Sequence, residues 1–249
     1  MKGFWAWLVG ASLVVAGAGV QAQDEVPPPP AEVREGVTFA AEPGVLYVPV
    51  REAAESLALR ARWDGERQTA LLEGKPVSDA ATRLLLEGAT LISVRDLEQW
   101  GAKVRWDAER GAARVTHGER VFWVRSGPKR VAVNRSTQQL RAWQGDRLVL
   151  ETRVSTGAPG NETPTGSFTA GPYRAKMHYS SLYDNAPMPW SVQITGNIFF
   201  HGYHSVPPRA ASHGCIRIPL WGGNAAKWLF EWIDNGTPVT IADDWPAEE

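Results

Sequence analysis

The 249-residue sequence has only one cysteine, five histidines and almost no charge imbalance, with a formal net charge of −1 at pH 7. One cysteine cannot form an internal disulfide, so a disulfide-stapled fold is excluded. The near-zero net charge provides no basic excess to attract a polyanion, and we expect no nucleic-acid partner. With 43% hydrophobic and 21% charged residues, the chain has a globular composition and enough length for one large domain or two modest ones.

An apolar run extends from Phe4 to Val20 after the single charge of Lys2, and the small residues of V-Q-A follow it. This pattern predicts a signal peptide over residues 1–22, cleaved after Ala22, and export to the periplasm or cell envelope. The alternative is a membrane anchor, but glycines and a serine interrupt the run, whereas a spanning helix prefers about 20 strongly apolar residues. We therefore expect no stable membrane insertion. No cysteine follows the run, so lipid attachment there is excluded.

Residues 23–44 contain four consecutive prolines, Pro27 to Pro30, and no periodic apolar pattern. Proline runs favour an extended, semi-rigid chain. We predict a proline-rich spacer over residues 23–44 that holds the folded part away from the export site.

Residues 45–115 contain an internal repeat. Y-V-P-V-R-E-A-A-E-S-L-A-L-R-A-R-W-D-G-E-R is answered by L-I-S-V-R-D-L-E-Q-W-G-A-K-V-R-W-D-A-E-R, and the two W-D-x-E-R ends begin 43 residues apart. Each copy predicts a short helix, a strand, a turn and a second strand. The predicted helix faces are Val50, Ala53 and Leu57 in the first copy and Val94, Leu97 and Gly101 in the second. Ser93 and Asp96 have capping-box spacing.

The repeat resembles the small module found at the amino terminus of copper amine oxidases and, detached, in many bacterial envelope proteins. We expect a non-catalytic spacer or wall-association module over residues 45–127. The resemblance does not imply copper, because His117 stands alone and the sequence offers no metal cluster there.

Gly127-Pro128 ends this pattern, and a β-rich domain is predicted over residues 128–243. Alternating residues on both sides of Gly145-Asp146 indicate a hairpin, and T-P-T-G at residues 163–166 indicates a turn. Residues 173–190 lack periodicity and are interpreted as a binding lid. A helix capped by Asn224 and a last strand, T-P-V-T-I, are predicted to complete the domain, and a fragment from about Pro128 is expected to fold by itself.

The stretch from Ile198 to Pro219, I-F-F-H-G-Y-H-S-V-P-P-R-A-A-S-H-G-C-I-R-I-P, holds the chemistry. It contains Cys215 and the three histidines that are candidates for the base that activates the thiol, namely His201, His204 and His213. A histidine-activated thiol is expected to react below the usual cysteine pKa of about 8.5. Gly214 lets the backbone approach a substrate closely, and the amides of His213, Gly214 and Cys215 are candidates for an oxyanion site.

These motifs resemble the L,D-transpeptidase family of the YkuD type, bacterial enzymes that act on peptidoglycan stem peptides. The residues that carry the resemblance are His201-Gly202, the signature S-H-G-C-I-R at residues 212–217, T-P-T-G at residues 163–166 and Met188-Pro189-Trp190. The resemblance implies a mainly β catalytic domain, a β-sandwich with one C-terminal helix, preceded here by a small α+β repeat domain.

The resemblance also implies roles for individual residues. Cys215 would be the nucleophile, His201 the general base and acid, the carbonyl at Gly202 the group that orients the imidazole, and His213 part of the site wall. The implied substrate-binding residues are Ser212, Gly214, Arg217, Met188 and Trp190. Arg217 either binds a stem-peptide carboxylate or braces the loop, and Trp190 either lines a groove or packs in the core.

The implied reaction releases D-alanine, leaves a thioester on Cys215 and transfers the acyl group to the amine of a stem peptide or a D-amino acid, without metal or other cofactor. One alternative is an L,D-carboxypeptidase or another cysteine peptidoglycan hydrolase. A second is a zinc site made of His201, His204, His213 and Cys215, although the prolines after His204 favour a loop over a helical turn. A third is a non-catalytic wall-binding protein.

Overall fold

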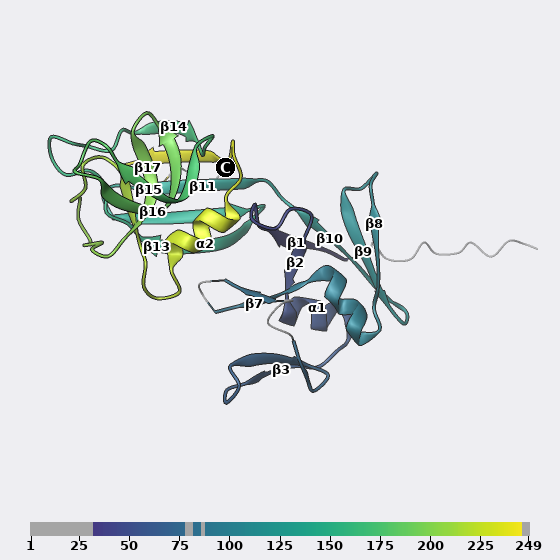
Figure 1. Cartoon of the computed structure of the whole chain (residues 1–249). Helices are drawn as coiled ribbons and strands as arrows, with labels where there is room; N and C mark the ends of the chain where they lie inside the picture. Colours follow the sequence, from purple (N-terminus) through teal and green to yellow (C-terminus); the bar gives the residue numbers. More distant parts are fainter. Residues whose placement is uncertain (1–31, 78–81, 86–87, 246–249) are drawn as a thin grey trace, which may run out of the picture. The chain divides into compact units, whose positions relative to one another are not determined.

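The computed structural model describes residues 32–77, 82–85 and 88–245 (Figure 1). The predicted signal peptide over residues 1–22 lies outside the described residues, and so does the proline run of the predicted spacer. Within the described residues, no helix combines the length and apolar character needed to cross a membrane.

The first part of the chain builds a seven-stranded sheet with strand order β6-β7-β2-β1-β10-β9-β8 and a separate three-stranded sheet, β3-β4-β5. The strands are β1 Glu32–Thr38, β2 Leu46–Pro49, β3 Ala61–Asp64, β4 Thr69–Leu72, β5 Lys75–Pro76, β6 Thr82–Leu84, β7 Thr90–Ser93, β8 Lys103–Asp107, β9 Ala112–His117 and β10 Arg120–Ser126. The helices are α1 Val50–Leu57 and the 3₁₀ helix η2 Val94–Trp100. Strand β1 falls inside the predicted spacer, so the prediction of extended spacer up to residue 44 is wrong. Val37 and Phe39 are buried, which makes this segment part of the fold.

The predicted repeat is confirmed in both copies: α1 is followed by β3, a turn and β4, and η2 by β8, a turn and β9. The W-D-x-E-R motif builds the turn each time. Asp64 accepts the Arg67 amide and pairs with its guanidinium, and Asp107 does the same with Arg110. The predicted capping box is wrong, because the Ser93 side chain makes no capping hydrogen bond and the second helix is 3₁₀.

The second part of the chain contains two further sheets, with orders β13-β12-β11-β19-β14 and β15-β16-β17-β18. Their strands are β11 Lys129–Asn134, β12 Gln139–Gln144, β13 Arg147–Arg153, β14 Gly166–Thr169, β15 Arg174–Ser180, β16 Ala186–Thr195, β17 Ile198–Tyr203, β18 Ile216–Pro219 and β19 Pro238–Ala242. Together with helix α2, Ala225–Trp232, they confirm the expected mainly β fold with one helix near the carboxyl end. The last strand of the chain, β19, lies between β11 and β14.

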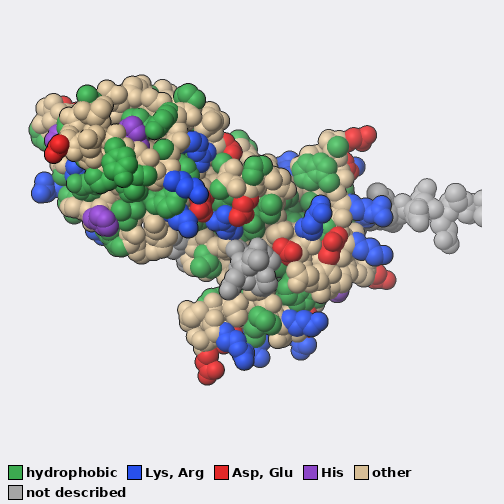
Figure 2. All heavy atoms as spheres, viewed as in Figure 1, with side chains coloured by type: hydrophobic (Ala, Val, Ile, Leu, Met, Phe, Trp, Pro, Cys, Tyr) green, Lys and Arg blue, Asp and Glu red, His purple; other side chains and the backbone are tan. Residues whose placement is uncertain are grey.

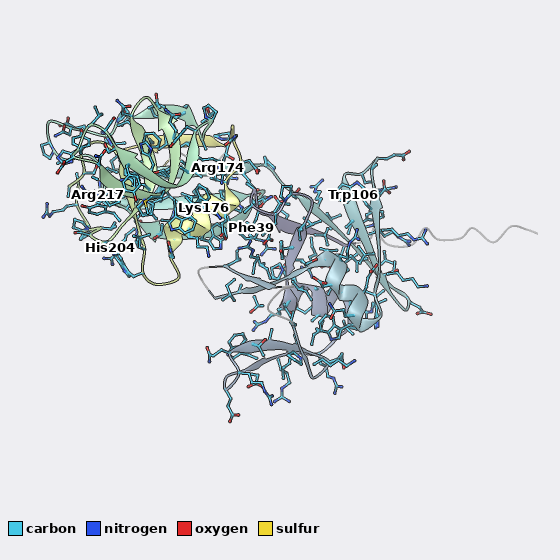
Figure 3. All side chains as sticks on the ribbon, in the orientation of Figure 1. Phe39, Trp106, Arg174, Lys176, His204 and Arg217 are labelled. Atoms are coloured by element: carbon cyan, nitrogen blue, oxygen red, sulfur yellow. The ribbon has the colours of Figure 1, made fainter. Side chains whose placement is uncertain are left out.

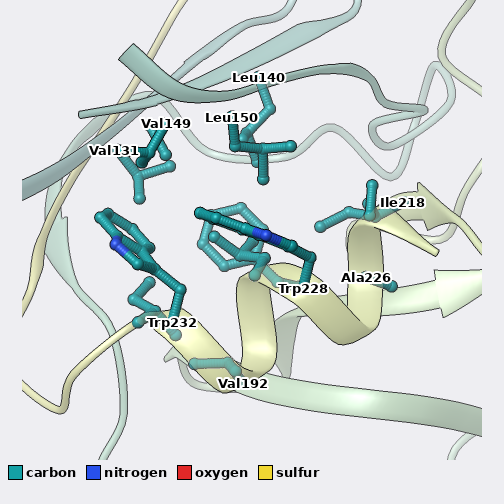
Figure 4. Packing of buried hydrophobic residues seen from close by; sticks show 14 of the residues in the cluster. Val131, Leu140, Val149, Leu150, Val192, Ile218, Ala226, Trp228 and Trp232 are labelled. Carbon is teal, nitrogen blue, oxygen red and sulfur yellow. The ribbon is translucent and has the colours of Figure 1, made fainter. Parts of the chain in front are cut away.

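Helix α2 packs against both sheets. Its Trp228 and Trp232 extend toward Val131, Leu140 and Leu150 of the five-stranded sheet (Figure 4). Strand β16 of the four-stranded sheet lies on the other side of the helix. The helix begins where the sequence predicts, because the Asn224 side chain accepts the Lys227 amide.

Residues 173–190, interpreted from sequence as an irregular lid, instead form most of the β15–β16 hairpin. Register pairs such as His178 with Met188 and Tyr179 with Pro187 hold it together. The prolines and the left-handed backbone of Trp190 (φ 58°) disturb the alternation of side chains, which is why the sequence shows no strand period there.

One of the two hydrophobic clusters contains residues of both parts of the chain, and the second cluster lies within the repeat alone. Phe39 stacks edge-on against Trp228 of α2, with 5.4 Å between ring centroids. Arg83 forms ion pairs with Glu42 and with Glu231 of α2. A fragment that begins at Pro128 would lose these contacts.

Candidate active site

The site forms where β17 and β18 pair in parallel, with Phe200 opposite Ile216 and His201 opposite Arg217. Phe200 and Ile216 point into the core. Side chains alternate between the two faces of a sheet, so His201 and Arg217 share the opposite face. Cys215 lies in the bend directly before β18, two residues before Arg217. The single cysteine therefore lies one strand away from His201.

His201 is buried, with 5% of its surface exposed, and its Nδ1 lies 3.0 Å from the Gly202 carbonyl oxygen. A carbonyl can only accept, so Nδ1 carries the proton and Nε2 keeps a free lone pair. Burial lowers the pKa of His201 to about 4, and the positive charges of Arg217 and His178 add to that effect, against the Gly202 hydrogen bond. His201 is therefore a neutral base at neutral pH.

Gly202 is required by close packing. A Cβ added there would lie 2.3 Å from Leu220 Cδ2 and 3.2 Å from Ala226 of α2. The strand can approach the helix only without a side chain at this position. The same residue thus fixes the imidazole through its carbonyl and lets the strand seat against α2.

Cys215 is partly buried, and its Sγ donates to the Asn197 carbonyl oxygen at 3.4 Å. Burial raises the pKa of the Cys215 thiol, while a hydrogen bond from the Phe199 backbone and the charge of Arg217 oppose the rise. Within the part of the chain that the structure describes, no hydrogen bond joins Cys215 to His201. Desolvation favours the uncharged form of both residues, and the expectation that the thiol reacts below the usual cysteine pKa stays a prediction.

The loop that carries Cys215 is held from within by Ser212. This residue is 1% exposed, and its hydroxyl donates to the Cys215 carbonyl oxygen at 2.5 Å and accepts the Gly214 amide at 3.1 Å. Its role is to shape the loop, and it presents no surface to a substrate. The Gly214 amide is likewise used inside the loop, so of the three candidate oxyanion donors only His213 and Cys215 remain.

Thr163 ties this loop to the preceding one. Its buried hydroxyl accepts the Gly157 amide at 2.9 Å and donates to the Gly214 carbonyl oxygen at 2.7 Å. The sequence indicated only a turn at T-P-T-G, and nothing in the pattern pointed to this second contact 51 residues away. Thr163 is a positioning residue that sequence reasoning missed.

Arg217 braces the site. Its Nη1 donates to the Ala211 carbonyl oxygen at 3.0 Å, and its guanidinium lies 4.2 Å from the centroid of the Tyr203 ring. Of the two roles weighed for Arg217, the structure contains the bracing one.

Two aromatic contacts from the β15–β16 hairpin complete the surroundings. Tyr183, in the turn of the hairpin, stacks on the exposed His213 ring with 4.4 Å between centroids. His178 stacks on Phe199 at 5.2 Å and its Nδ1 lies 3.1 Å from the Tyr173 hydroxyl. Both contacts join residues far apart in sequence, so no local motif could have found them.

Met188 and Trp190 do not line the site. Met188 is 6% exposed and therefore presents almost no surface. Trp190 packs against Phe230 of α2, with 5.6 Å between ring centroids, and contacts the core. The structure contains the packing alternative for Trp190, which is partly buried, and the substrate-binding role of both residues stays a prediction.

The four residues of the alternative zinc site are dispersed over different environments. His204 is exposed in the loop after β17, His213 stacks on Tyr183, and His201 is buried (Figure 3 labels His204 and Arg217). Among residues 32–77, 82–85 and 88–245, no three His, Cys, Asp or Glu side chains gather as metal ligands would.

Comparison with known proteins addresses the same part of the chain. Residues 128–241 match the family model described as the L,D-transpeptidase catalytic domain, YkuD. None of the curated proteins compared with the chain is a significant match.

Similar solved structures include L,D-transpeptidases from Stackebrandtia nassauensis (25% identity, TM-score 0.42) and Xylanimonas cellulosilytica (28% identity, TM-score 0.41). These matches cover 49% and 47% of this chain, and 58% and 61% of the other chains, less than two thirds of their length. An L,D-transpeptidase from Mycobacterium smegmatis matches over 86% of this chain and 96% of its own, with 17% identity and a TM-score of 0.42. Residues 128–241, which carry His201 and Cys215, thus match the L,D-transpeptidase catalytic domain of the YkuD family.

Proposed function

We propose that the protein is an exported cysteine transpeptidase that acts on peptidoglycan stem peptides. It cleaves the L,D bond before the terminal D-alanine through a thioester on Cys215 and transfers the acyl group to an amine. The observation that supports this most directly is the neutral His201, fixed through Nδ1 by the Gly202 carbonyl, in the strand that pairs with the one directly after Cys215 within the matched domain.

The mechanism follows from two uncharged partners. As the Cys215 sulfur attacks the carbonyl carbon of the L-configured residue, its proton passes to Nε2 of His201. The imidazolium then gives this proton to the nitrogen of D-alanine, which leaves, and a thioester remains. An incoming amine attacks the thioester and gives its proton to His201, and the thiolate that leaves regains that proton. Atoms and charges balance without a cofactor.

The acceptor decides the product. A stem-peptide amine yields a cross-link, a D-amino acid yields a modified stem, and water yields only a trimmed stem, which is the activity of an L,D-carboxypeptidase. All three reactions pass through the same thioester. A transferase and a hydrolase therefore differ only in the second step, the attack of the acceptor on the thioester.

The amino-terminal parts complete the proposal. The apolar run over residues 1–22 serves as the export signal, and the repeat of residues 45–127, with its resemblance to the copper amine oxidase amino-terminal module, serves as a wall-association element. These assignments rest on sequence patterns.

The test uses a disaccharide tetrapeptide as donor with and without an added amine. We expect release of D-alanine, a covalent adduct on Cys215 by intact mass spectrometry and, with the amine present, a new amide. Cys215→Ala should lose all three and His201→Ala should lose turnover.

His204→Ala is the matched control, since this exposed histidine has no role in the mechanism. It should keep most of the rate, and chelators should have no effect. Release of D-alanine by Cys215→Ala, or inhibition by chelation, would contradict the proposal, while release without amide formation would identify the hydrolase.

A further inference from the structure

The repeat in the first part of the chain folds around an approximate two-fold axis. Strands β2 and β7 come from equivalent places in the two copies and pair antiparallel, with Tyr47 opposite Ser93 and Pro49 opposite Leu91. In the sequence repeat, Tyr47 corresponds to Leu91 and Pro49 to Ser93. The first pair therefore maps onto the second, as a two-fold axis between the strands requires.

This symmetry produces two equivalent surface grooves. One has a volume of about 420 Å³ and is lined by Val94, Arg95 and Trp106 together with residues 44–46 of the other copy. The other has a volume of about 640 Å³ and is lined by Val50, Arg51 and Trp63 together with residues 88–90. These residues correspond in the repeat, whereas the second groove is also lined by Arg147 of β13, which has no counterpart in the first. Both volumes are in the usual range for sites that bind small molecules or one unit of a polymer.

Each groove presents an exposed indole. Trp63 is 53% and Trp106 62% exposed, although tryptophan is usually well covered (Trp106 is labelled in Figure 3). Within the described residues, neither ring stacks on another aromatic ring or on a cation. Trp123 and Trp143, by contrast, are covered by arginines. The two faces are thus open to a ligand.

The charges in the grooves are mixed. Arg51 and Arg95 are exposed and, among the described residues, make no ion pair or hydrogen bond with a side chain. Each groove also includes a carboxylate, Glu52 in one and Glu98 in the other. Lys and Arg side chains lie near β3, but not as one continuous patch (Figure 2). Glu52 forms an ion pair with Arg147 at 2.8 Å, and Arg62 lines the same groove, so only Glu98 presents an unpaired carboxylate among the described residues. Glu98 opposes a polymer with a phosphate on every unit, and a hydroxyl- and amide-rich polymer with spaced carboxylates suits grooves that contain charges of both signs.

We propose that the two grooves are equivalent binding sites for the glycan strand of peptidoglycan. The apolar C–H face of a sugar ring packs on Trp63 or Trp106, and Arg51 or Arg95 receives a carboxylate or amide oxygen of the attached peptide. A repeating polymer suits two equal sites, because one strand that occupies both binds with an avidity greater than either affinity. This inference deepens the proposed function, since it names the part of the wall that the repeat holds.

The experiment measures binding separately from catalysis. The full-length Cys215→Ala protein is mixed with purified peptidoglycan sacculi, and the bound fraction is determined by sedimentation. Trp63→Ala and Trp106→Ala should each weaken binding by about tenfold, and the double variant should abolish it. Trp221→Ala, an exposed tryptophan outside both grooves, and Arg120→Ala, an exposed arginine outside them, should bind like the parent. Thermal melting checks that each variant is folded.

Two further arms distinguish the outcomes. In the Cys215→Ala background, a soluble disaccharide peptide can fill only one groove. It should bind weakly and almost equally to the parent and to either single tryptophan variant. In the active enzyme, turnover of that small donor should be unchanged by the tryptophan substitutions, so loss of sacculus binding is separated from failure of the proposed reaction. Undiminished sacculus binding by the double tryptophan variant overturns the proposal. So does binding that depends on the arginines and on salt but not on the tryptophans, which would instead identify an anionic polymer.

Discussion

The two reactive side chains of the site, His201 and Cys215, are both kept uncharged by burial. The pKa of His201 falls to about 4 and that of Cys215 rises above its ordinary value. A thiolate–imidazolium pair at rest would require shifts in the opposite directions. Proton transfer in this site therefore accompanies attack on the substrate and does not precede it.

This charge state predicts slow alkylation of the resting enzyme. The rate of Cys215 carboxamidomethylation by iodoacetamide should rise with pH and reach its half-maximum above about 8.5. His201→Gln should hardly move this midpoint, although it should abolish turnover. Mass spectrometry after timed quenching measures both rates. A midpoint below pH 7 that disappears in His201→Gln would show that the pair is ionised after all.

Burial of the neutral His201 also predicts a loss of stability in acid. The unfolded chain binds a proton at about pH 6.5 and the folded chain only at about pH 4, so the unfolded state holds more protons between these values. The free energy of unfolding should decrease as the pH falls from about 6.5 to 4, by on the order of 3 kcal/mol from this residue. Urea melts of wild type and His201→Gln measure it, and the variant should show a shallower slope. Parallel slopes would refute the assignment.

The sequence was enough to identify the reactive residues, but not how deeply each site residue is buried. The order of His201, Gly202 and Cys215 was enough to predict the imidazole–carbonyl contact through the family resemblance. Ser212 and Met188 were predicted to touch substrate and are buried instead. Burial depends on strands that pack from elsewhere in the chain, which a local motif does not contain.

Among the elements of the fold, the two loops that meet at Thr163 determine the position of the nucleophile. Its hydroxyl bridges the Gly157 amide and the Gly214 carbonyl, and all three groups are withdrawn from water. Such buried groups gain little net free energy when paired but lose much when one partner is removed.

Thr163→Val should therefore cost about 1–3 kcal/mol of stability, because it leaves a buried donor and a buried acceptor without a partner at nearly unchanged volume. It should also lower turnover by loosening the loop of Cys215. Thr165→Ala, in the same turn but exposed, is the control for stability. Thermal denaturation and D-alanine release measure the two effects, and a wild-type melting temperature for Thr163→Val would contradict the role.

The sequence predicted the elements best where a pattern repeats. Asp64 and Asp107 occupy the same place in the two W-D-x-E-R motifs, and each closes an equivalent turn. The sequence therefore predicted the strand, turn and strand correctly in both copies. The β15–β16 hairpin was missed because prolines and the left-handed Trp190 interrupt its alternation. Strand β1 was missed because its parallel pairing with β10, through Glu32 and Phe122 at one end, bridges most of the first part of the chain.

For the whole molecule, the core joins the repeat to the catalytic domain. Phe39 is 2% exposed and packs between Tyr47 and Trp228, while the Trp228 Nε1 donates to the Leu84 carbonyl oxygen at 2.8 Å. The two parts should therefore unfold together, and the catalytic domain should depend on a residue that precedes it by almost ninety positions.

Phe39→Ala should destabilise the whole protein by about 3–5 kcal/mol. It should lower the melting temperature of a single unfolding transition that far-UV circular dichroism and tryptophan fluorescence both report. Leu182→Ala, an exposed apolar residue, is the matched control. A fragment from Pro128 should be less stable still. If that fragment has the melting temperature and the turnover rate of the full chain, the contacts between the two parts do not stabilise the catalytic domain. The expectation from sequence of an independent domain would then be correct.

The position of β19 has a consequence for timing. Among the residues that the structure describes, the strand that separates β11 from β14 is the last one, and β14 pairs with no other strand of its sheet. When the chain emerges amino terminus first, β14 and the adjoining T-P-T-G turn wait for β19, and pairings of such long sequence separation form late. The loop that presents Cys215 is therefore anchored only after synthesis has passed residue 242.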